Sequence, residues 1–156
     1  MKVLVLHGPN LNLLGEREPE VYGTLTLDQI DQRILDHAAS LNVEVRTARS
    51  NVEGELVTLI QDARSWAAGI VLNPGGYAHT SVAIRDAVAA IDVPVIEVHL
   101  SNPSAREEFR HTDLVGGACA GVISGFGWRS YALALDALSG LGNEADSGSG
   151  PGRPRK

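Results

Sequence analysis

Runs of consecutive apolar residues mark the strands of a buried sheet. Residues 2–6, 69–73 and 94–99 (KVLVL, GIVLN and PVIEVH) are short and rich in branched side chains, which is typical of strands covered on both faces. Residues 43–47 (VEVRT) alternate between apolar and polar side chains, which predicts a strand at the edge of the sheet. Residues 118–124 (ACAGVIS) complete a set of five predicted strands.

Segments with apolar residues at helical spacing separate these strands. Residues 27–41 place apolar side chains on one helical face, directly behind a capping box at residues 26–29. Further helical patterns begin near residues 50, 80 and 128. Strands that alternate with helices in this way predict a parallel sheet with helices on both faces.

The last helical pattern is expected to stop near Gly140, where the periodic part of the chain ends. Residues 142–156 (GNEADSGSGPGRPRK) are rich in Gly, Pro, Ser and charge, which predicts a disordered tail. We therefore expect a single α/β domain over residues 1–141, followed by this tail. Right-handed crossovers and the size of the domain favour the strand order 2-1-3-4-5.

An unusually long connection follows the first strand. Strand-to-helix loops usually take about two to six residues, but residues 7–23 (HGPNLNLLGEREPEVYG) carry no periodic pattern. Such a loop is either an active-site lid or a solvated segment. Sheets of this kind bind ligands beyond the carboxyl ends of their strands, where the winding reverses, and the loop leaves the first strand at that point.

The composition limits the classes of binding partner and the cellular compartment that we expect. The 156 residues are 44% hydrophobic and carry a formal net charge of -6, so attraction to nucleic acid or to a membrane surface is not expected. The single cysteine, Cys119, excludes an intrachain disulfide and fits a reducing compartment. Residues 3–6 are too short an apolar run for a signal peptide. We therefore expect a cytoplasmic protein.

Glu97, His99 and Ser101 share one face of the fourth strand because they are spaced by two. A carboxylate beside a histidine fixes its tautomer and favours the protonated imidazole, which suits a general acid. An isolated pair of this kind is more often a buried polar contact. Its place at the mouth of the predicted ligand site favours the catalytic interpretation.

Tyr22 and Arg17 lie five residues apart in the long loop. A free tyrosine is a poor base near neutrality because its pKa is about 10, and a close guanidinium favours the phenolate. The pair is either a general base or a tyrosine packed under the loop. Arg106 and Arg110 are four apart, which on a helix gives either an anion clamp or a solvated face.

The other histidines and the lysines indicate less about function. His79 precedes a helix start, where backbone N–H groups bind an anion or are simply capped. His7, His37 and His111 have no partner that the sequence identifies, so we expect them to be structural or exposed. The chain has no GxGxxG, GxxxxGK, GxSxG, CxxC or HExxH motif. Lysine occurs only at positions 2 and 156, so catalysis through an imine is not expected.

Four blocks of sequence resemble the type II 3-dehydroquinate dehydratases. They are HGPNLNLLGEREPEVYG, SNVEGELV, NPGGYAHTSVAIRDA and IEVHLSNPSAREEFRH, in the family's order, and they spread over most of residues 1–140. The resemblance implies a flavodoxin-like three-layer sandwich and trimers that assemble into a dodecamer. It also implies that the chain removes water from 3-dehydroquinate through an enolate, without metal or cofactor, to give 3-dehydroshikimate in the shikimate or quinate pathway.

The resemblance also implies roles for residues at matching positions. Tyr22 resembles the general base, Arg17 the lid arginine that favours the tyrosinate, and His99 the general acid. Glu97 matches the residue that orients the acid, and Asn10 the residue that holds a water against the enolate oxygen. The substrate-binding positions match Asn73, His79, Leu100, Ser101 and Arg110, together with Asp86, which reaches the site of a neighbouring subunit.

The chain departs from the family pattern at four positions outside these roles. The family usually has asparagine at His7, glutamine at Arg49, alanine at Gly76 and threonine at Ala78. These departures concern the geometry of the pocket and not the reaction. The alternative function is a flavodoxin-like module that binds an anion or a nucleotide without chemistry, and it predicts that Tyr22 is dispensable.

Overall fold

A parallel sheet forms the centre of the molecule. The computed structural model describes the backbone of residues 1–147 and the side chains of residues 1–142. Five strands lie in the described part, namely β1 (Lys2–His7), β2 (Glu44–Arg49), β3 (Gly69–Asn73), β4 (Val95–His99) and β5 (Gly121–Ser124). Their order is β2-β1-β3-β4-β5, which confirms both the predicted order and the predicted edge strand.

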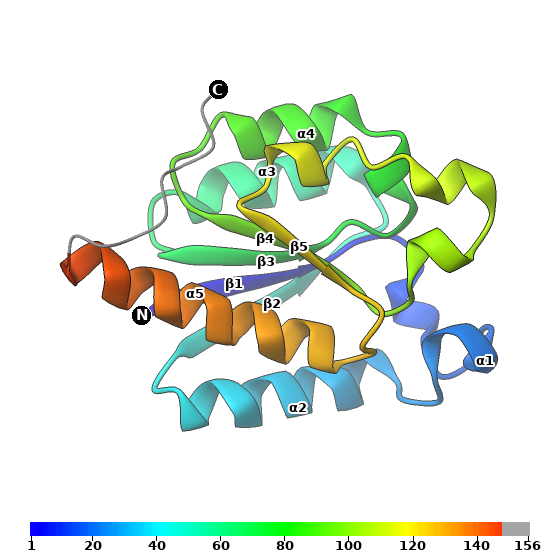
Figure 1. Cartoon of the computed structure of the whole chain (residues 1–156), viewed down its shortest axis with the longest axis horizontal. Helices are drawn as coiled ribbons and strands as arrows, with labels where there is room; N and C mark the ends of the chain where they lie inside the picture. Colours follow the sequence, from blue (N-terminus) through cyan, green and yellow to red (C-terminus); the bar gives the residue numbers. More distant parts are fainter. Residues whose placement is uncertain (148–156) are drawn as a thin grey trace.

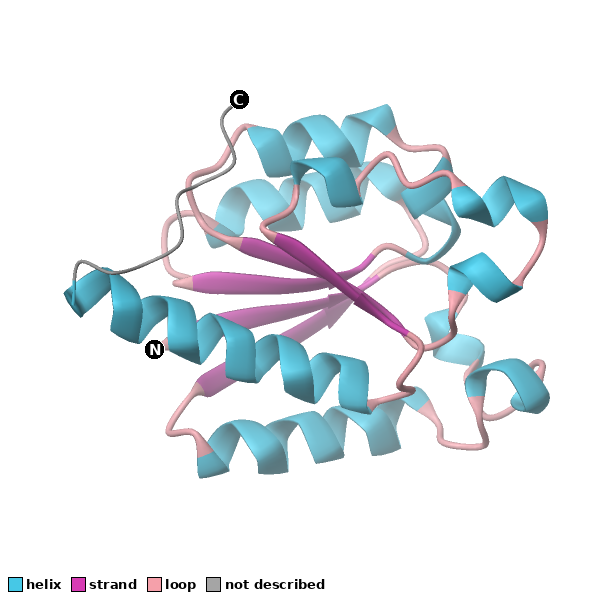
Figure 2. Cartoon of the chain, viewed as in Figure 1, coloured by secondary structure: helices cyan, strands magenta, loops and turns pink. Residues whose placement is uncertain are grey.

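Helices cover both faces of the sheet and give the molecule three layers (Figures 1 and 2). On one face lie α2 (Leu27–Ser40) and α5 (Arg129–Ser147). On the other face lie α3 (Glu53–Ala63) and α4 (Val82–Ala89). This is the flavodoxin-like arrangement expected for the strand order.

Each face of the sheet has its own hydrophobic core. Val5 of β1 lies in the same core as Ile34 of α2, whereas its neighbour Leu6 lies in the core that contains Ile60 of α3. This alternation follows from the period of two in a strand. Because both faces are buried, polar side chains with a chemical role gather in the loops at the carboxyl edge.

The start of α2 agrees with the sequence. The Thr26 hydroxyl accepts a hydrogen bond from the backbone N–H of Gln29 at 3.2 Å, and the Gln29 side-chain oxygen accepts one from the backbone N–H of Thr26 at 3.0 Å. This is the predicted capping box, which satisfies donors that a helix start leaves free. It also fixes the point where the long loop after β1 ends.

The loop after β1 approaches the loop after β3 very closely. The backbone N–H of Gly8 donates to the carbonyl of Asn73 at 2.7 Å. A Cβ atom on Gly8 would lie 2.7 Å from the carbonyl carbon of Pro74, so only glycine allows this approach. The contact brings together the two loops that flank the point where the winding of the sheet reverses.

The end of the last helix differs from the prediction. α5 does not stop near Gly140 but continues to Ser147, so residues 142–147 of the predicted tail are helical. Leu141 packs against the core, and a Cβ on Gly142 would lie 3.7 Å from Sδ of Met1. The packing of Leu141 opposes the cost of about 1 kcal/mol that a glycine carries inside a helix. The rest of the predicted tail, residues 148–156, lies outside the described residues.

The segment before β5 also differs from the prediction. β5 begins at Gly121, so residues 118–120 of the predicted strand lie outside it, and Ala118 is the last residue of a 3-10 turn over Gly116–Ala118. The Asp113 carboxylate accepts a hydrogen bond from the backbone N–H of Gly116 at 2.8 Å and so stabilises this turn. Within residues 1–147, no helix is both long and apolar enough to cross a membrane.

Candidate active site

A pocket opens at the carboxyl edge of the sheet, where the loops after β1, β3 and β4 meet. Parallel strands bring these loops to one edge, as the topology predicts. All but two of the predicted site residues line the pocket: Asn10, Arg17, Tyr22, Asn73, His79, His99, Leu100, Ser101 and Arg110. Glu97 lies behind His99 and is fully buried, and Asp86 lies elsewhere, exposed on α4.

The long loop after β1 covers this pocket and is anchored on the core. Leu11 begins a 3-10 turn at Leu11–Leu13, and Leu14 follows it. Both side chains are buried, at 7% and 3% exposure. The short helix α1 (Pro19–Tyr22) follows and ends at Gly23, whose φ of 84° favours glycine. α1 lies at the same end of the molecule as the turns after β4 (Figure 1). Because these leucines are buried, the loop is not a freely solvated segment.

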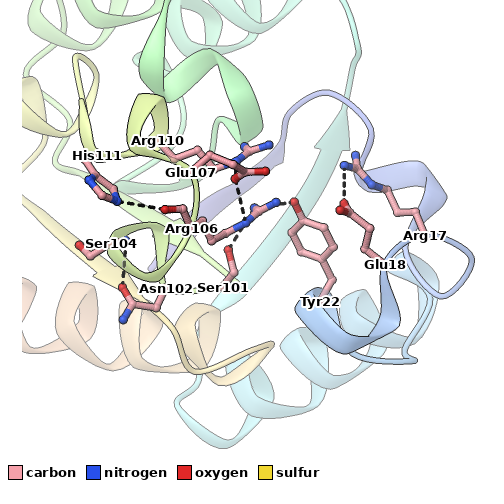
Figure 3. A network of polar contacts seen from close by, with 10 residues as sticks. All are labelled: Arg17, Glu18, Tyr22, Ser101, Asn102, Ser104, Arg106, Glu107, Arg110 and His111. Carbon is pink, nitrogen blue, oxygen red and sulfur yellow. Dashed lines mark hydrogen bonds and ion pairs between the residues drawn. The ribbon is translucent and has the colours of Figure 1, made fainter.

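Two guanidinium groups flank the ring of Tyr22, which α1 presents to the pocket (Figure 3). Nη1 of Arg106 donates to the Tyr22 hydroxyl at 2.7 Å. Arg17 lies over the same ring, with Cζ 5.2 Å from its centre, and its Nη2 donates to Glu18 at 3.0 Å. The predicted partner, Arg17, therefore contacts the ring alone, whereas Arg106 contacts both the oxygen and the ring, with Cζ 5.1 Å from the ring centre.

Arg106 and Arg110 do not share the face of one helix. The segment forms two 3-10 turns, Pro103–Ala105 and Glu108–His111, and Arg106 lies between them. The Arg106 side chain is 12% exposed, so the solvated-face interpretation is wrong for this residue. Arg110 donates from Nε to Glu107 at 2.7 Å. The pKa of the Glu107 carboxyl is lowered by its own backbone N–H and by Arg110.

Glu97 and His99 form the predicted pair. Nε2 of His99 lies 2.5 Å from Oε1 of Glu97, as expected for a charge-assisted hydrogen bond. Burial raises the pKa of the Glu97 carboxyl above its ordinary value, the hydrogen bond and charge of His99 lower it, and the Asp113 carboxylate raises it. The other oxygen of Glu97, Oε2, is buried without a hydrogen-bond partner among the described residues. The Glu97 carboxylate contacts the imidazole and does not itself line the pocket.

Asp113 is a neighbour of this pair that the sequence did not reveal. One carboxylate oxygen of Asp113, one of Glu97 and one ring nitrogen of His99 lie within 4.8 Å of one another. Such a set has the residue types of a metal site. Two ligands of tetrahedral zinc lie about 3.3 Å apart, whereas Glu97 and His99 are at hydrogen-bond distance. The arrangement fits a hydrogen-bonded acid better than a metal centre.

The other lining residues supply polar groups from fixed backbones. Asn10 has a left-handed backbone (φ 66°), and its N–H donates to the side chain of Asn51 at 2.9 Å. Nδ1 of His79 lies 2.7 Å from the carbonyl of Thr112, so this nitrogen carries the proton and Nε2 stays free to accept. The His79 ring stacks near that of His99, with centres 6.5 Å apart.

The structure identifies partners for the three histidines that had none identifiable from the sequence. His7 contacts Asp31 and Tyr131, and His37 lies 2.8 Å from the carboxylate of Asp136. His111 contacts the carbonyl of Arg106 at 3.2 Å. The His7 and His37 contacts join residues far apart in the chain, so no local pattern could have indicated them.

Comparison with known proteins identifies the family. A family model described as dehydroquinase class II matches residues 1–139. The chain belongs to this family. It is therefore a hydro-lyase of the type II class.

Individual dehydroquinases agree with this assignment in sequence and in fold. A 3-dehydroquinate dehydratase of Roseiflexus castenholzii is 50% identical over 97% of this chain and 94% of its own length. Another, of Phenylobacterium zucineum, is 55% identical over 89% of this chain and 96% of its own length. The crystal structure of a type II dehydroquinase from Butyrivibrio crossotus superposes with a TM-score of 0.87 at 45% identity, covering 88% of this chain and 97% of that one.

Proposed function

We propose that the chain removes water from 3-dehydroquinate to give 3-dehydroshikimate, by anti elimination through an enolate. The observation that carries this proposal is the pocket itself: the Tyr22 hydroxyl at the end of α1 and the His99 imidazole at the end of β4 line it, together with several donors for a polyhydroxy acid. The names of the relatives, 3-dehydroquinate dehydratase, support the choice of substrate.

In the first step, Tyr22 acts as the base. Its phenolate takes a proton from the carbon beside the ketone. The electrons of that C–H bond form a C=C bond while the π electrons of the C=O bond move to the oxygen, which gives the enolate. The two guanidinium groups stabilise the negative charge of the phenolate, Arg106 through its hydrogen bond of 2.7 Å and Arg17 from above the ring. Asn10, at the entrance of the same loop, holds a water against the enolate oxygen.

In the second step, His99 acts as the acid. The enolate electrons return, the C–O bond breaks, and the imidazolium gives its proton to the departing hydroxyl, which leaves as water. Nε2 is engaged with Glu97 at 2.5 Å, so Nδ1 is the nitrogen that delivers the proton. The buried Glu97 orients the ring and stabilises its positive charge.

Binding of the substrate uses the remaining lining residues. Asn73, Arg110, Ser101 and the backbone of Leu100 offer donors to its hydroxyl and carboxylate oxygens, and Nε2 of His79 offers an acceptor to one of its hydroxyl groups. The reaction needs no imine, which agrees with the place of the lysines. Lys2 begins β1 at the opposite end of the sheet, half-exposed beside Glu44, and Lys156 lies outside the described residues.

We also propose the assembly and setting that the resemblance implies. The chain forms trimers that associate into a dodecamer, in which Asp86 of one subunit reaches the pocket of another. Its single cysteine, which is buried, is compatible with work in a reducing cytoplasm. The product enters the shikimate or the quinate pathway.

A turnover assay with purified protein tests the function. Incubation with 3-dehydroquinate should give the ultraviolet absorbance of the conjugated product, and Tyr22→Phe should fold normally and lose nearly all turnover. Borohydride added with substrate should leave the enzyme active, because no imine forms. A folded, oligomeric protein that binds the substrate and leaves it unchanged would instead identify a binding module.

A further inference from the structure

A line of buried hydrogen bonds joins the pocket to α2. Its members are Asn73 at the end of β3, Tyr131 of α5, His7 at the end of β1 and Asp31 of α2. His7 and Asn73 are paired residues of neighbouring parallel strands. Tyr131 is fully buried, and His7 and Asn73 are 1% and 2% exposed, so water does not compete for the bonds among these three residues. The Asp31 side chain, at the far end of the line, is 22% exposed. Only Asn73 lines the pocket.

The distances are those of good hydrogen bonds along the whole line. Nδ2 of Asn73 donates to the Tyr131 hydroxyl at 2.9 Å. The same hydroxyl lies 2.9 Å from Nδ1 of His7, and Nε2 of His7 lies 2.7 Å from the Asp31 carboxylate. At the pocket end, Oδ1 of Asn73 accepts from the backbone N–H of Gly75 at 3.1 Å.

One set of bond directions gives every donor in this line an acceptor. The N–H of Gly75 can only donate, so the Asn73 amide must turn its oxygen to Gly75 and its NH₂ group to Tyr131. Since the Tyr131 oxygen accepts that bond, its own proton goes to Nδ1 of His7. Burial raises the pKa of the Tyr131 hydroxyl, so it keeps this proton. The imidazole proton then lies on Nε2, where the Asp31 carboxylate accepts it.

We propose that His7 is a positioning residue, which acts through Tyr131 to hold the Asn73 amide in one orientation at the pocket. That orientation leaves the second N–H of Asn73 for an acceptor oxygen of the substrate. Asp31 keeps His7 in the tautomer that the line requires. This inference rests on the proposed function, because it takes Asn73 as a substrate-binding residue.

Two substitutions of His7 separate its two ring nitrogens. In His7→Gln the amide reaches the place of Nε2 and keeps the contact with Asp31, but leaves the Tyr131 hydroxyl without an acceptor. In His7→Asn the side-chain oxygen takes the place of Nδ1 and keeps that acceptor. His37→Gln is the matched control, because His37 makes a similar contact with Asp136, at 2.8 Å, and does not line the pocket.

Steady-state kinetics with 3-dehydroquinate tests the proposal. We expect His7→Gln to raise KM about tenfold, as for one lost hydrogen bond to the substrate, with kcat changed less than about threefold. His7→Asn should recover most of this loss, and His37→Gln should keep the KM of the wild type. A wild-type KM in His7→Gln, an equal rise in His37→Gln, or no recovery in His7→Asn overturns the proposal.

A second measurement does not depend on turnover. The ¹⁵N shifts of labelled histidine, with His7→Asn used for assignment, should show a neutral His7 ring protonated on Nε2 and not on Nδ1. Protonation on Nδ1 overturns the proposal. Failure of the wild-type enzyme to turn over substrate would refute the proposed function, and the tautomer would still decide whether the line of hydrogen bonds runs as argued.

Discussion

Two positive side chains flank the Tyr22 ring, and their positions are not equivalent. Arg106 places Nη1 2.7 Å from the phenolic oxygen, where the charge of a phenolate is concentrated. Arg17 lies 5.2 Å from the ring centre and shares its guanidinium with Glu18. A hydrogen bond to a charged group contributes about 1.5–3 kcal/mol. In the proposed mechanism, Arg106 is therefore the larger source of stabilisation for the phenolate.

We expect Arg106→Gln to lower kcat about ten- to hundredfold, because glutamine retains an N–H donor but not the charge. Arg106→Lys keeps the charge and should lose less. Both variants are compared with the wild type by steady-state kinetics on 3-dehydroquinate, with thermal unfolding as a check of the fold. A kcat in Arg106→Gln equal to that of the wild type would show that Arg106 does not support the base.

The carboxyl pair behind His99 makes stability depend on pH. The pKa of Glu97 is raised from 4.5, mainly by burial, with a further contribution from Asp113. The folded chain therefore binds more protons than the unfolded chain at every pH between 4.5 and the raised pKa of Glu97. In that window the free energy of unfolding falls as the pH rises. The Asp113 carboxylate contributes to this rise, so it opposes ionisation of Glu97 in the folded chain.

We expect Asp113→Asn to raise Tm at neutral pH relative to the wild type, and to raise it less near pH 4, where Glu97 is protonated in both. For a chain of this size about 1 kcal/mol shifts Tm by about 2–4 °C, which calorimetry resolves. Asparagine can still accept the hydrogen bond from Gly116. Asp36→Asn, an exposed carboxylate of α2, is the control, and a Tm difference that does not change with pH would exclude the repulsion.

At the scale of elements, the strands and long helices follow from local sequence. α2 shows this best, because its capping box and its apolar stripe both lie within residues 26–41. Boundaries set by tertiary contacts were not predictable in the same way. The continuation of α5 past Gly140 depends on packing of Leu141, and the late start of β5 depends on a turn stabilised by Asp113.

The same distinction applies to the site. The topology alone predicted that Tyr22 and His99 lie at one edge of the sheet, because Tyr22 belongs to the connection after β1 and His99 ends β4. Arg106 was missed as the partner of Tyr22 because the bond joins residues 84 positions apart across two 3-10 turns. The partner of His7 was not predictable because the contact with Tyr131 joins residues 124 positions apart. Long-range partners of polar groups need the assembled fold, whereas the identity of the groups does not.

At the scale of the whole molecule, some exposed residues favour contacts with another copy of the chain. Asp86 is exposed on α4 and is not among the residues that line the pocket of its own chain. Val122 of the edge strand β5 and Phe126 beyond it are 47% and 61% exposed. Exposed apolar side chains at a sheet edge favour burial against another copy. These features support the proposed assembly, in which Asp86 completes a neighbouring site.

Mixed oligomers can test this sharing of sites. Asp86→Ala and Tyr22→Phe should each be nearly inactive, but oligomers reassembled from equal amounts of both should recover about a quarter of the wild-type activity, because about one site in four combines an intact Tyr22 with an intact Asp86 from its neighbour. Tyr22→Phe mixed with His99→Ala is the control. Tyr22 and His99 line the pocket of the same chain, so every site keeps a defect and no activity should return. If the Asp86 mixture also stays inactive, while each variant folds and assembles, Asp86 does not serve a neighbouring subunit.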